Sequence, residues 1–417
     1  MSHIIFHIDV NSAYLSWTAV EQLKNGADVD IRTIPAIIGG DRESRHGIVL
    51  AKSPSAKKFG IRTGEPVVNA FRKCPNLHMD PPNHRMYREY SRRLMDFLKT
   101  YTPEIEQVSV DECYMDFTGI AQRFSSPVEA AYEIKARVYE KFGFTVNVGI
   151  STNKLLAKMA SDFEKPNRVH TLFPEEVKEK MWPLPISDLF MAGHSSVETL
   201  RKLEIQTIGD LAKADPKLIE LHLKSHGRRL WEFANGMDDS IVEPEKAEAK
   251  GVGNSTTLSK DVSTKEDAQK VLLSLAQSVG GRLRKHGYHA GVVNVEIKYA
   301  DFTVNSHQKQ LERMTASDQV IYQTAVELFC EMWNGKPIRL LGIRTSKLSQ
   351  EGEPQQLSLF DLNFHSSDNI SEEVKSFENS QKHEKLDQAL DEIRKKFGKD
   401  AVVRASFLKK PEKEEKM

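Results

Sequence analysis

Three acidic residues in apolar segments are the strongest chemical signal in this chain. Asp9 ends an apolar run at the start of the sequence, and Asp111 and Glu112 lie side by side in a later one. A carboxylate inside an apolar strand is unfavourable unless it is paired, hydrogen-bonded or bound to a metal. Neighbouring residues of a regular strand point to opposite faces, so Asp111 and Glu112 reach one site only at a strand end or in a hairpin.

Carboxylate oxygens in such a cluster suit a hard cation such as Mg²⁺. Two such ions, held ~3.5–4 Å apart by shared carboxylates, serve in-line phosphoryl and nucleotidyl transfer in many enzymes. Spacing alone leaves a second interpretation open, in which the three acids are solvated residues at strand ends.

The elements that must position these acids are predicted from apolar periodicity and from turn residues. Their order, strands with intervening helices, indicates an α+β layer rather than a doubly wound sheet. Strands are expected at 3–10, 34–40, 47–51, 106–117, 144–150, 291–299 and 338–347, and helices at 13–24, 55–59, 84–101, 127–142, 152–163, 264–286, 317–333 and 382–397, with short helices over 184–235.

Several motifs, taken together, resemble those of Y-family DNA polymerases, and within that family the bacterial DNA polymerase IV (DinB-like) group. The likeness covers roughly residues 3–345. It rests on Ile8-Asp9-Val10-Asn11-Ser12-Ala13-Tyr14, Ser109-Val110-Asp111-Glu112-Cys113-Tyr114, Gly149-Ile150-Ser151-Thr152-Asn153-Lys154, Ala157-Lys158 and Lys165-Pro166-Asn167.

This resemblance implies a multidomain right-hand polymerase with a ferredoxin-like palm, small fingers, a helix-hairpin-helix thumb and an α/β little-finger domain. It implies a template-directed, error-prone, lesion-bypassing enzyme that adds dNTPs to a primer. The implied divisions are palm 1–18 and 76–166, fingers 19–75, thumb 167–240, linker 241–250, little finger 251–348 and a flexible tail 349–417.

The resemblance also assigns roles in the active site. Asp9, Asp111, Glu112 and the carbonyl of Val10 would hold two Mg²⁺ ions, which activate the primer 3′-hydroxyl and neutralise the triphosphate. Lys165 would contact the triphosphate as a point charge, and Tyr14 would be the steric gate against a 2′-hydroxyl. Without the family context, Lys165 reads as a surface lysine and Tyr14 as a core aromatic.

The predicted nucleotide pocket departs from the family pattern. Relatives carry Tyr and Arg where this chain has Pro54 and Lys57, and Lys57 lacks the bidentate fork of arginine. Lys52 or Ser53 is a possible substitute contact. Leu50 is expected at the roof over the nascent base pair, so we expect less tolerance of bulky adducts than in relatives with a smaller residue there.

The predicted DNA contacts lie in the carboxyl-terminal half. Segments 184–203 and 205–212 resemble a helix-hairpin-helix, whose turn presents backbone N–H groups to a phosphate. Gly193 keeps the turn glycine, but Ser195 replaces the usual second one, and a plain helical hairpin remains an alternative. Residues 251–350 carry 13 Lys and Arg against 9 Asp and Glu, and candidate phosphate contacts there are Arg282, Arg284, Lys285, Lys298, Arg339, Arg344 and Lys347.

A short apolar motif follows the last predicted strand. Exposed leucine and phenylalanine in a polar stretch usually anchor in a partner's groove. The motif resembles the peptide that docks on the bacterial sliding clamp (β subunit), and the alternative is a tail strand that packs on the chain itself. Its residues are Gln356, Leu357, Ser358, Leu359 and Phe360.

Length and composition limit the remaining possibilities. With 417 residues, 39% of them hydrophobic and 28% charged, two to four globular domains are expected. No apolar stretch approaches the ~18 residues of a membrane span, and the amino terminus is unlike a signal peptide. The three cysteines are scattered and favour a reducing compartment, so we expect a cytoplasmic monomer.

Two rival functions stay open at this point. One is a catalytically weak or inactive DNA-binding scaffold associated with the clamp, and the other is a different two-metal enzyme such as a nucleotide cyclase. The intact acids disfavour the scaffold, and the predicted thumb and clamp motif disfavour the cyclase. The sequence offers no second acid cluster that would indicate a proofreading nuclease.

Overall fold

The computed structural model describes residues 3–41, 47–245, 248–350, 370–398 and 401–402, with side chains beyond residue 369 described from 383 onward. The chain forms two compact units, Met1–Lys246 and Ala247–Met417. Each unit has its own sheet and its own hydrophobic core. The predicted α+β class is confirmed.

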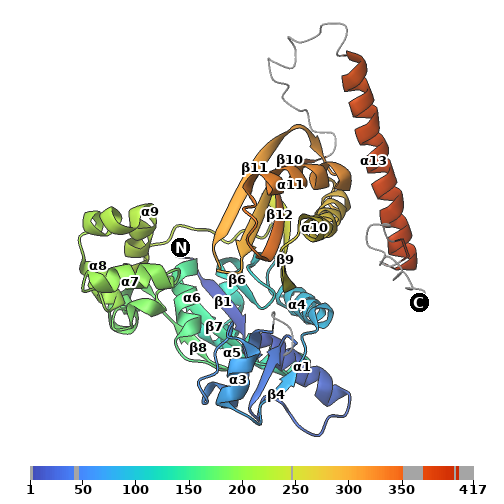
Figure 1. Cartoon of the computed structure of the whole chain (residues 1–417). Coiled ribbons are helices and arrows are strands. Elements are labelled where there is room, and N and C mark those ends of the chain that lie inside the picture. The colour runs from blue at the N-terminus through green and yellow to red at the C-terminus, as the bar shows by residue number, and fades with distance from the viewer. Residues whose placement is uncertain (1–2, 42–46, 246–247, 351–369, 399–400, 403–417) are drawn as a thin grey trace. The chain divides into compact units, whose positions relative to one another are not determined.

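A five-stranded sheet is the centre of the first unit (Figure 1). Its strand order is β5-β6-β1-β7-β8, and all neighbours are antiparallel except β7 and β8. The strands are β1 (Ile5–Val10), β5 (Ile105–Gln107), β6 (Glu112–Asp116), β7 (Val146–Ser151) and β8 (Val169–Thr171).

The two faces of this sheet have different coverings. Phe6, Ile8 and Val10 point into the main core, which helices α4 and α5 complete. On the opposite face Ile5 and Tyr114 pack against α6. The helices around the sheet are α1 (Ala13–Lys24), α4 (His84–Leu98), α5 (Pro127–Phe142), α6 (Lys154–Asp162) and the 3₁₀ helix Thr118–Arg123.

A smaller sheet and a helical region complete this unit. The sheet, in order β3-β2-β4, has a separate core that includes Ile37, Val49 and Ile61. Its elements are β2 (Ala36–Gly39), β3 (Val49–Lys52), β4 (His78–Asp80), α2 (Pro54–Lys57) and α3 (Val67–Lys73). The helical region has short helices Pro174–Glu176, Val177–Met181 and Ile186–Asp188, followed by α7 (His194–Lys202), α8 (Ile208–Lys213) and α9 (Pro216–Ala234).

The second unit is a four-stranded antiparallel sheet with two helices on one face (Figure 1). Val293, Val295 and Ile297 of β10 point into the core under these helices. The strand order is β11-β10-β12-β9. The elements are β9 (Gly251–Val262), α10 (Lys265–Lys285), β10 (Tyr288–Tyr299), β11 (Val304–Thr315), α11 (Asp318–Met332) and β12 (Ile338–Gln350).

Helix α13 (Ile370–Phe397) is longer than the predicted helix 382–397. It contacts α10 and α11 through acidic side chains. Asp387 is buried, whereas three residues of the predicted apolar face, Leu386, Ile393 and Phe397, are exposed. The helix therefore docks by its polar side, and the expectation that its apolar face is the packing face is wrong.

The expected linker 241–250 begins in contact with the first unit. Lys154 Nζ donates to the carbonyl of Ile241, and the amide of Glu243 donates to Glu106 Oε2. Val242 packs beside Ile5 and Tyr114. Within the described ranges, no helix is both long enough and apolar enough to cross a membrane.

Candidate active site

The backbone brings the three predicted acids to neighbouring strand ends. In the antiparallel register of β1 and β6, Asp9 lies opposite Glu112. The amide of Val10 donates to the carbonyl of Asp111 over 3.0 Å, which places Asp111 beside the end of β1. Side-chain exposure is 13% for Asp9 and 22% for Glu112, so both carboxylates reach the surface.

Ser109 shapes the turn that lets two adjacent acids lie at this strand end. Its hydroxyl donates to Asp111 Oδ1 over 2.6 Å. The same oxygen accepts the amides of Asp111 and Glu112, each at 3.2 Å. A regular strand begins only at Glu112, so the strict alternation of faces does not apply to Asp111.

The pKa values of the acids differ because their surroundings differ. Burial, with further contributions from the charges of Asp9 and Glu112, raises the pKa of Asp111 above its ordinary value. The contact with His7, followed by the charge of Lys158, lowers the pKa of Glu112 to about 2. Negative charge thus accumulates at a half-buried position, which a cation would relieve.

Two lysines connect these acids in a chain of ion pairs. Lys158 Nζ lies 3.0 Å from Glu112 Oε2 and 3.3 Å from Asp162. Lys165 Nζ lies 2.8 Å from Asp162 and directly contacts the carboxylate of Asp9. Lys158 and Asp162 had no predicted role, and the only sequence signal for Lys158 is its place in the Ala157-Lys158 motif.

The acidic donors fit a hard cation in chemistry and in backbone placement. Their side chains, however, do not converge on one point, since among the described residues no three His, Cys, Asp or Glu side chains are grouped to hold a metal. Asp9 and Glu112 instead face the ammonium groups of Lys165 and Lys158. Metal binding therefore requires rotation of these carboxylates, which their partial exposure allows.

Tyr14 stands next to this acid cluster. Its ring stacks on Tyr87, with centroids 4.3 Å apart and planes 8° apart, and meets the edge of His84 at 6.0 Å. Burial, followed by the charge of Asp111, raises the pKa of the Tyr14 hydroxyl. Tyr14 is thus a rigid aromatic surface beside Asp111, and its predicted steric-gate role stays a prediction.

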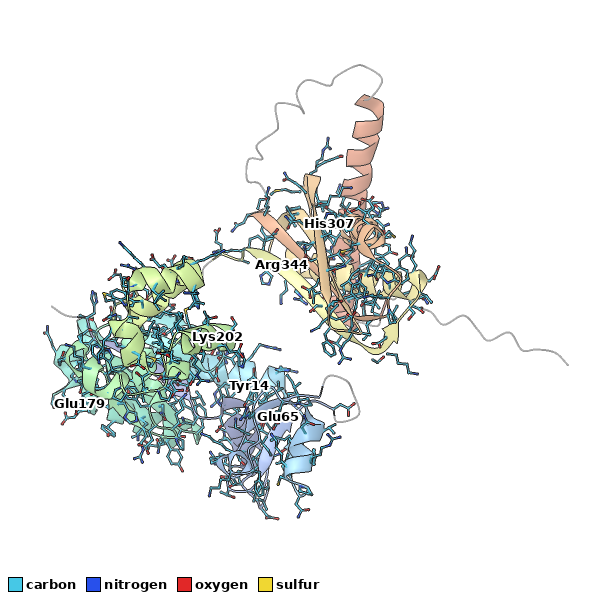
Figure 2. All side chains as sticks on the ribbon, turned by 60° about the vertical axis from the view of Figure 1, so that its left-hand side comes forward. Tyr14, Glu65, Glu179, Lys202, His307 and Arg344 are labelled. Carbon is cyan, nitrogen blue, oxygen red and sulfur yellow. The ribbon has the colours of Figure 1, made fainter. Side chains whose placement is uncertain are left out.

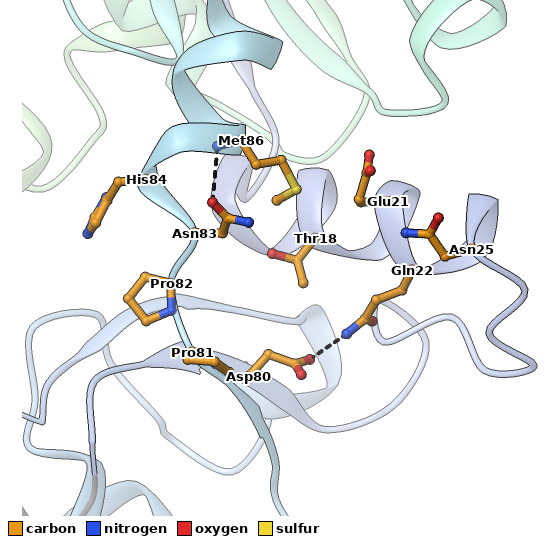
Figure 3. Close-up of a pocket in the computed structure, with 10 residues that line it drawn as sticks. All are labelled: Thr18, Glu21, Gln22, Asn25, Asp80, Pro81, Pro82, Asn83, His84 and Met86. Atoms are coloured by element: carbon orange, nitrogen blue, oxygen red, sulfur yellow. Dashed lines mark hydrogen bonds between the residues drawn. The ribbon is translucent and has the colours of Figure 1, made fainter. Parts of the chain in front are cut away.

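A cavity of about 480 Å³ adjoins this aromatic cluster (Figure 3). His84, which contacts Tyr14, lines it, whereas Asp9, Asp111 and Glu112 do not. Its wall comes from α1 and from the segment leading into α4, and the lining residues are Thr18, Glu21, Gln22, Asn25, Asp80, Pro81, Pro82, Asn83, His84 and Met86. The cavity is therefore distinct from the carboxylate site.

Strand β3 places Leu50 and Lys52 on one face, because alternate residues of a strand share a side. Burial, followed by the charge of Lys57, lowers the pKa of Lys52, which shows that the two ammonium groups lie near each other. Ser53 is fully buried and its hydroxyl donates to the carbonyl of Ile34. Of the two suggested substitutes for the family contacts, only Lys52 has a free surface.

The predicted DNA contacts fall into three groups. Gly193, the N-cap of α7, and Ser195 are exposed. Lys298 and Arg344 point to the sheet face opposite α10 and α11, and Arg344 is exposed (Figure 2). Arg339 and Lys298 both lie over the exposed ring of Phe302, at 4.7 and 5.0 Å from its centroid.

Arg282 and Arg284 lie on α10, away from that face. Arg282 is exposed and donates to the carbonyl of Gly253. The Arg284 side chain is only 6% exposed and bonds Asp318 and Asp391 at 2.8 and 2.7 Å. Because its guanidinium is buried and paired, Arg284 is not available to a phosphate, and we withdraw it from the proposed contacts. The clamp motif, Gln356, Leu357, Leu359 and Phe360, lies outside the described residues.

Comparison with known proteins places this geometry in a family. Residues 8–162 match the impB/mucB/samB family, and residues 249–359 match the C-terminal domain of that family. A Clostridium acetobutylicum protein named DNA polymerase IV is 47% identical over 413 residues, which cover 99% of this chain and 100% of the relative. A Bacillus subtilis protein named DNA polymerase IV 1 is 36% identical, with coverages of 100% and 95%.

A solved structure shares the fold. A Y-family DNA polymerase chimera of Dbh and Dpo4 superposes with a TM-score of 0.72 at 24% identity, covering 83% of this chain and 99% of the chimera. The fold is therefore that of a Y-family DNA polymerase. The chain belongs to the impB/mucB/samB family, in the group whose curated members are named DNA polymerase IV.

Proposed function

We propose that this chain is a DNA-directed DNA polymerase of the error-prone, lesion-bypass type, which adds dNTPs to a primer 3′-hydroxyl. The observation that carries this proposal is the register that sets Asp9 opposite Glu112 with Asp111 beside them. A non-catalytic scaffold would gain nothing from an acid whose charge is unfavourable in its own surroundings, as that of Asp111 is. A nucleotide cyclase is disfavoured because the family match extends over residues 249–359.

Y-family polymerases are metal-dependent nucleotidyltransferases, and we assign two Mg²⁺ ions to this site. Asp9, Asp111, Glu112 and the carbonyl of Val10 are the residues that would hold them. When bound, the ions lower the pKa of the primer hydroxyl and neutralise the charge that develops on the triphosphate. The protein's own part is to keep three carboxylates at one strand end.

The incoming nucleotide is proposed to lie between Tyr14 and the β3 face that carries Leu50. Tyr14 would exclude a 2′-hydroxyl, because Tyr87 behind it prevents the ring from yielding. Lys165 and Lys57 would contact the triphosphate. Lys165 now pairs with Asp9, and a metal ion on that carboxylate would free the ammonium group for the phosphates.

Primer-template DNA is proposed to be held through its phosphates. Gly193 and Ser195 would supply polar groups at the start of α7, and Arg282, Lys298, Arg339 and Arg344 would supply charge in the second unit. Such contacts give weak sequence preference and strong salt dependence. The sliding clamp as partner of Gln356–Phe360, a monomeric state and a cytoplasmic location belong to the same proposal.

Primer extension on a template with a single abasic site tests this function. With Mg²⁺ and all four dNTPs, the chain is expected to insert a nucleotide opposite the lesion and to continue beyond it. Failure to extend primers on damaged and undamaged templates alike, despite DNA binding, would favour the scaffold instead.

A further inference from the structure

A buried histidine lies directly behind the acid cluster. His7 precedes Asp9 by two residues on β1, so both side chains point to the face of the sheet that α6 covers. Only 1% of the His7 side chain is exposed. A polar ring at this depth is unfavourable unless its nitrogens are used, and the proposed function has given it no task.

The close approach of α6 fixes the surroundings of this ring. Gly149 lies opposite His7 on β7. A Cβ atom at Gly149 would stand 2.0 Å from the carbonyl oxygen of Ala157 and 2.4 Å from the amide of Ser161. The absence of a side chain thus lets α6 lie directly on the sheet, and this brings Ser161 and Lys158 against β1.

The two nitrogens of His7 have different neighbours. Nδ1 lies 2.7 Å from the hydroxyl of Ser161, and Nε2 lies 3.3 Å from Glu112 Oε2. Burial lowers the pKa of His7, so the ring is neutral near pH 7 and carries one proton. A proton on Nε2 points an N–H at the carboxylate and leaves Nδ1 to accept from Ser161, whereas the other tautomer sets a lone pair against the carboxylate.

Lys158 reaches the same oxygen of Glu112, at 3.0 Å. Both contacts therefore fall on Oε2, and Oε1 is the oxygen left to face a cation. Lys158 is a flexible side chain that it shares with Asp162, whereas the imidazole is rigid and anchored at both nitrogens. The ring can therefore define one rotamer of Glu112 better than the lysine can.

We propose that His7 is a positioning residue of the polymerase site: anchored by Ser161, it holds Glu112 through Oε2 so that Oε1 is presented to the divalent cation. Partners behind a ligating carboxylate orient it, and their loss typically weakens metal affinity about 10–100-fold. The inference rests on the proposed function, because it takes Glu112 as a ligand. His7 itself touches neither metal nor substrate.

Binding of Mn²⁺, followed by electron paramagnetic resonance, tests this role without turnover. The full chain would be titrated with Mn²⁺ in the presence of a dideoxy-terminated primer-template and the matching dNTP. His7→Phe keeps a ring but removes both nitrogens, and His7→Gln returns an N–H near the place of Nε2. His170→Phe is the matched control, since His170 is a half-buried histidine on β8 of the same sheet.

We expect His7→Phe to weaken Mn²⁺ binding about 10-fold or more, His7→Gln to recover part of the loss, and His170→Phe to bind as the unaltered chain does. In extension assays with that chain, the Mg²⁺ concentration for half-maximal rate should rise similarly, with little change at saturating Mg²⁺. Mn²⁺ affinity unchanged in His7→Phe, or equally reduced in His170→Phe, would overturn the inference. Failure of the unaltered chain to extend a primer would instead count against the proposed function.

Discussion

At the scale of single residues, the nucleotide pocket shows how one contact can replace another. The family's Tyr and Arg are absent, and Pro54 begins α2, where its fixed backbone angle suits the first helical position. Lys52 shares a strand face with Leu50 and lies near Lys57. A triphosphate between the two ammonium groups would relieve their mutual repulsion.

Replacement of Lys52 by Met is therefore expected to raise the KM for dNTP about 10-fold, with a smaller change in kcat, because a charge contact to the bound triphosphate is lost. Steady-state single-nucleotide insertion measures both constants. Lys58→Met removes an exposed neighbouring charge as the control. Equal KM values for the two variants would show that Lys52 does not contact the nucleotide.

His7 shows what sequence reasoning missed at this scale. Asp9, Asp111 and Glu112 could be found from sequence because acids in apolar runs are rare and their motifs are specific. A histidine two residues before Asp9 was a usable signal, since strand periodicity puts both on one face. Its contact with Ser161, however, depends on how α6 packs across the sheet, and this no local pattern reveals.

At the scale of elements, local signals fixed some boundaries and failed at others. Helix α5 was predicted with its observed ends, because Ser126 caps it and Gly143 with φ 79° ends it. Strands β9 and β11 were not predicted. Both lie at edges of their sheet, and their polar sequences lack the apolar alternation that indicates a strand.

The packing of α6 on β7 gives a prediction for Gly149. Gly149→Ala is expected to destabilise the protein by about 2 kcal/mol or more, because the new methyl group meets backbone atoms that cannot rotate away. Gly119→Ala adds the same group where nothing lies within 4 Å. Urea unfolding followed by circular dichroism compares them, and equal midpoints would contradict this account of α6.

The docking of α13 predicts an unusual pH dependence. Burial raises the pKa of Asp318 to about 6 from its ordinary 3.8. The folded state therefore holds this proton more tightly than the unfolded state, so stability is full below about pH 4 and falls as pH rises to about 6. The loss amounts to as much as about 3 kcal/mol.

Denaturation at pH 5 and pH 7 measures this effect. The unaltered chain should gain stability in its second unit at pH 5, and Asp318→Asn, which cannot ionise, should gain less. Glu112, with a lowered pKa of about 2, is ionised throughout this range and does not interfere. A pH response that is identical in both proteins would contradict the assignment to Asp318.

At the scale of the whole molecule, net charge gave no indication of a nucleic-acid partner, since 59 basic residues balance 59 acidic ones. The distribution is informative instead. Arg344 and Lys298 occupy the sheet face left open by α10 and α11. Burial of Arg284 could not be foreseen, because its acidic partners on α11 and α13 are distant in sequence.

Arg344→Ala is expected to weaken binding to primer-template DNA similarly for unrelated sequences and to reduce the slope of log affinity against log salt by about 1. Lys265→Ala, an exposed residue at the start of α10, is the control. Fluorescence anisotropy at several salt concentrations gives both slopes. An unchanged slope for Arg344→Ala would remove this face from the proposed DNA contacts.

The central claim is that Asp9, Asp111 and Glu112 form the metal site of a polymerase. Its most direct test is primer extension with Mg²⁺ by the unaltered chain, by Asp111→Asn and by Asp96→Asn, an exposed acid on α4, with DNA affinity measured in parallel. We predict extension by the unaltered chain and by Asp96→Asn, and a loss of at least about 1000-fold in Asp111→Asn at unchanged DNA affinity. Extension by Asp111→Asn at the rate of the unaltered chain would contradict the account.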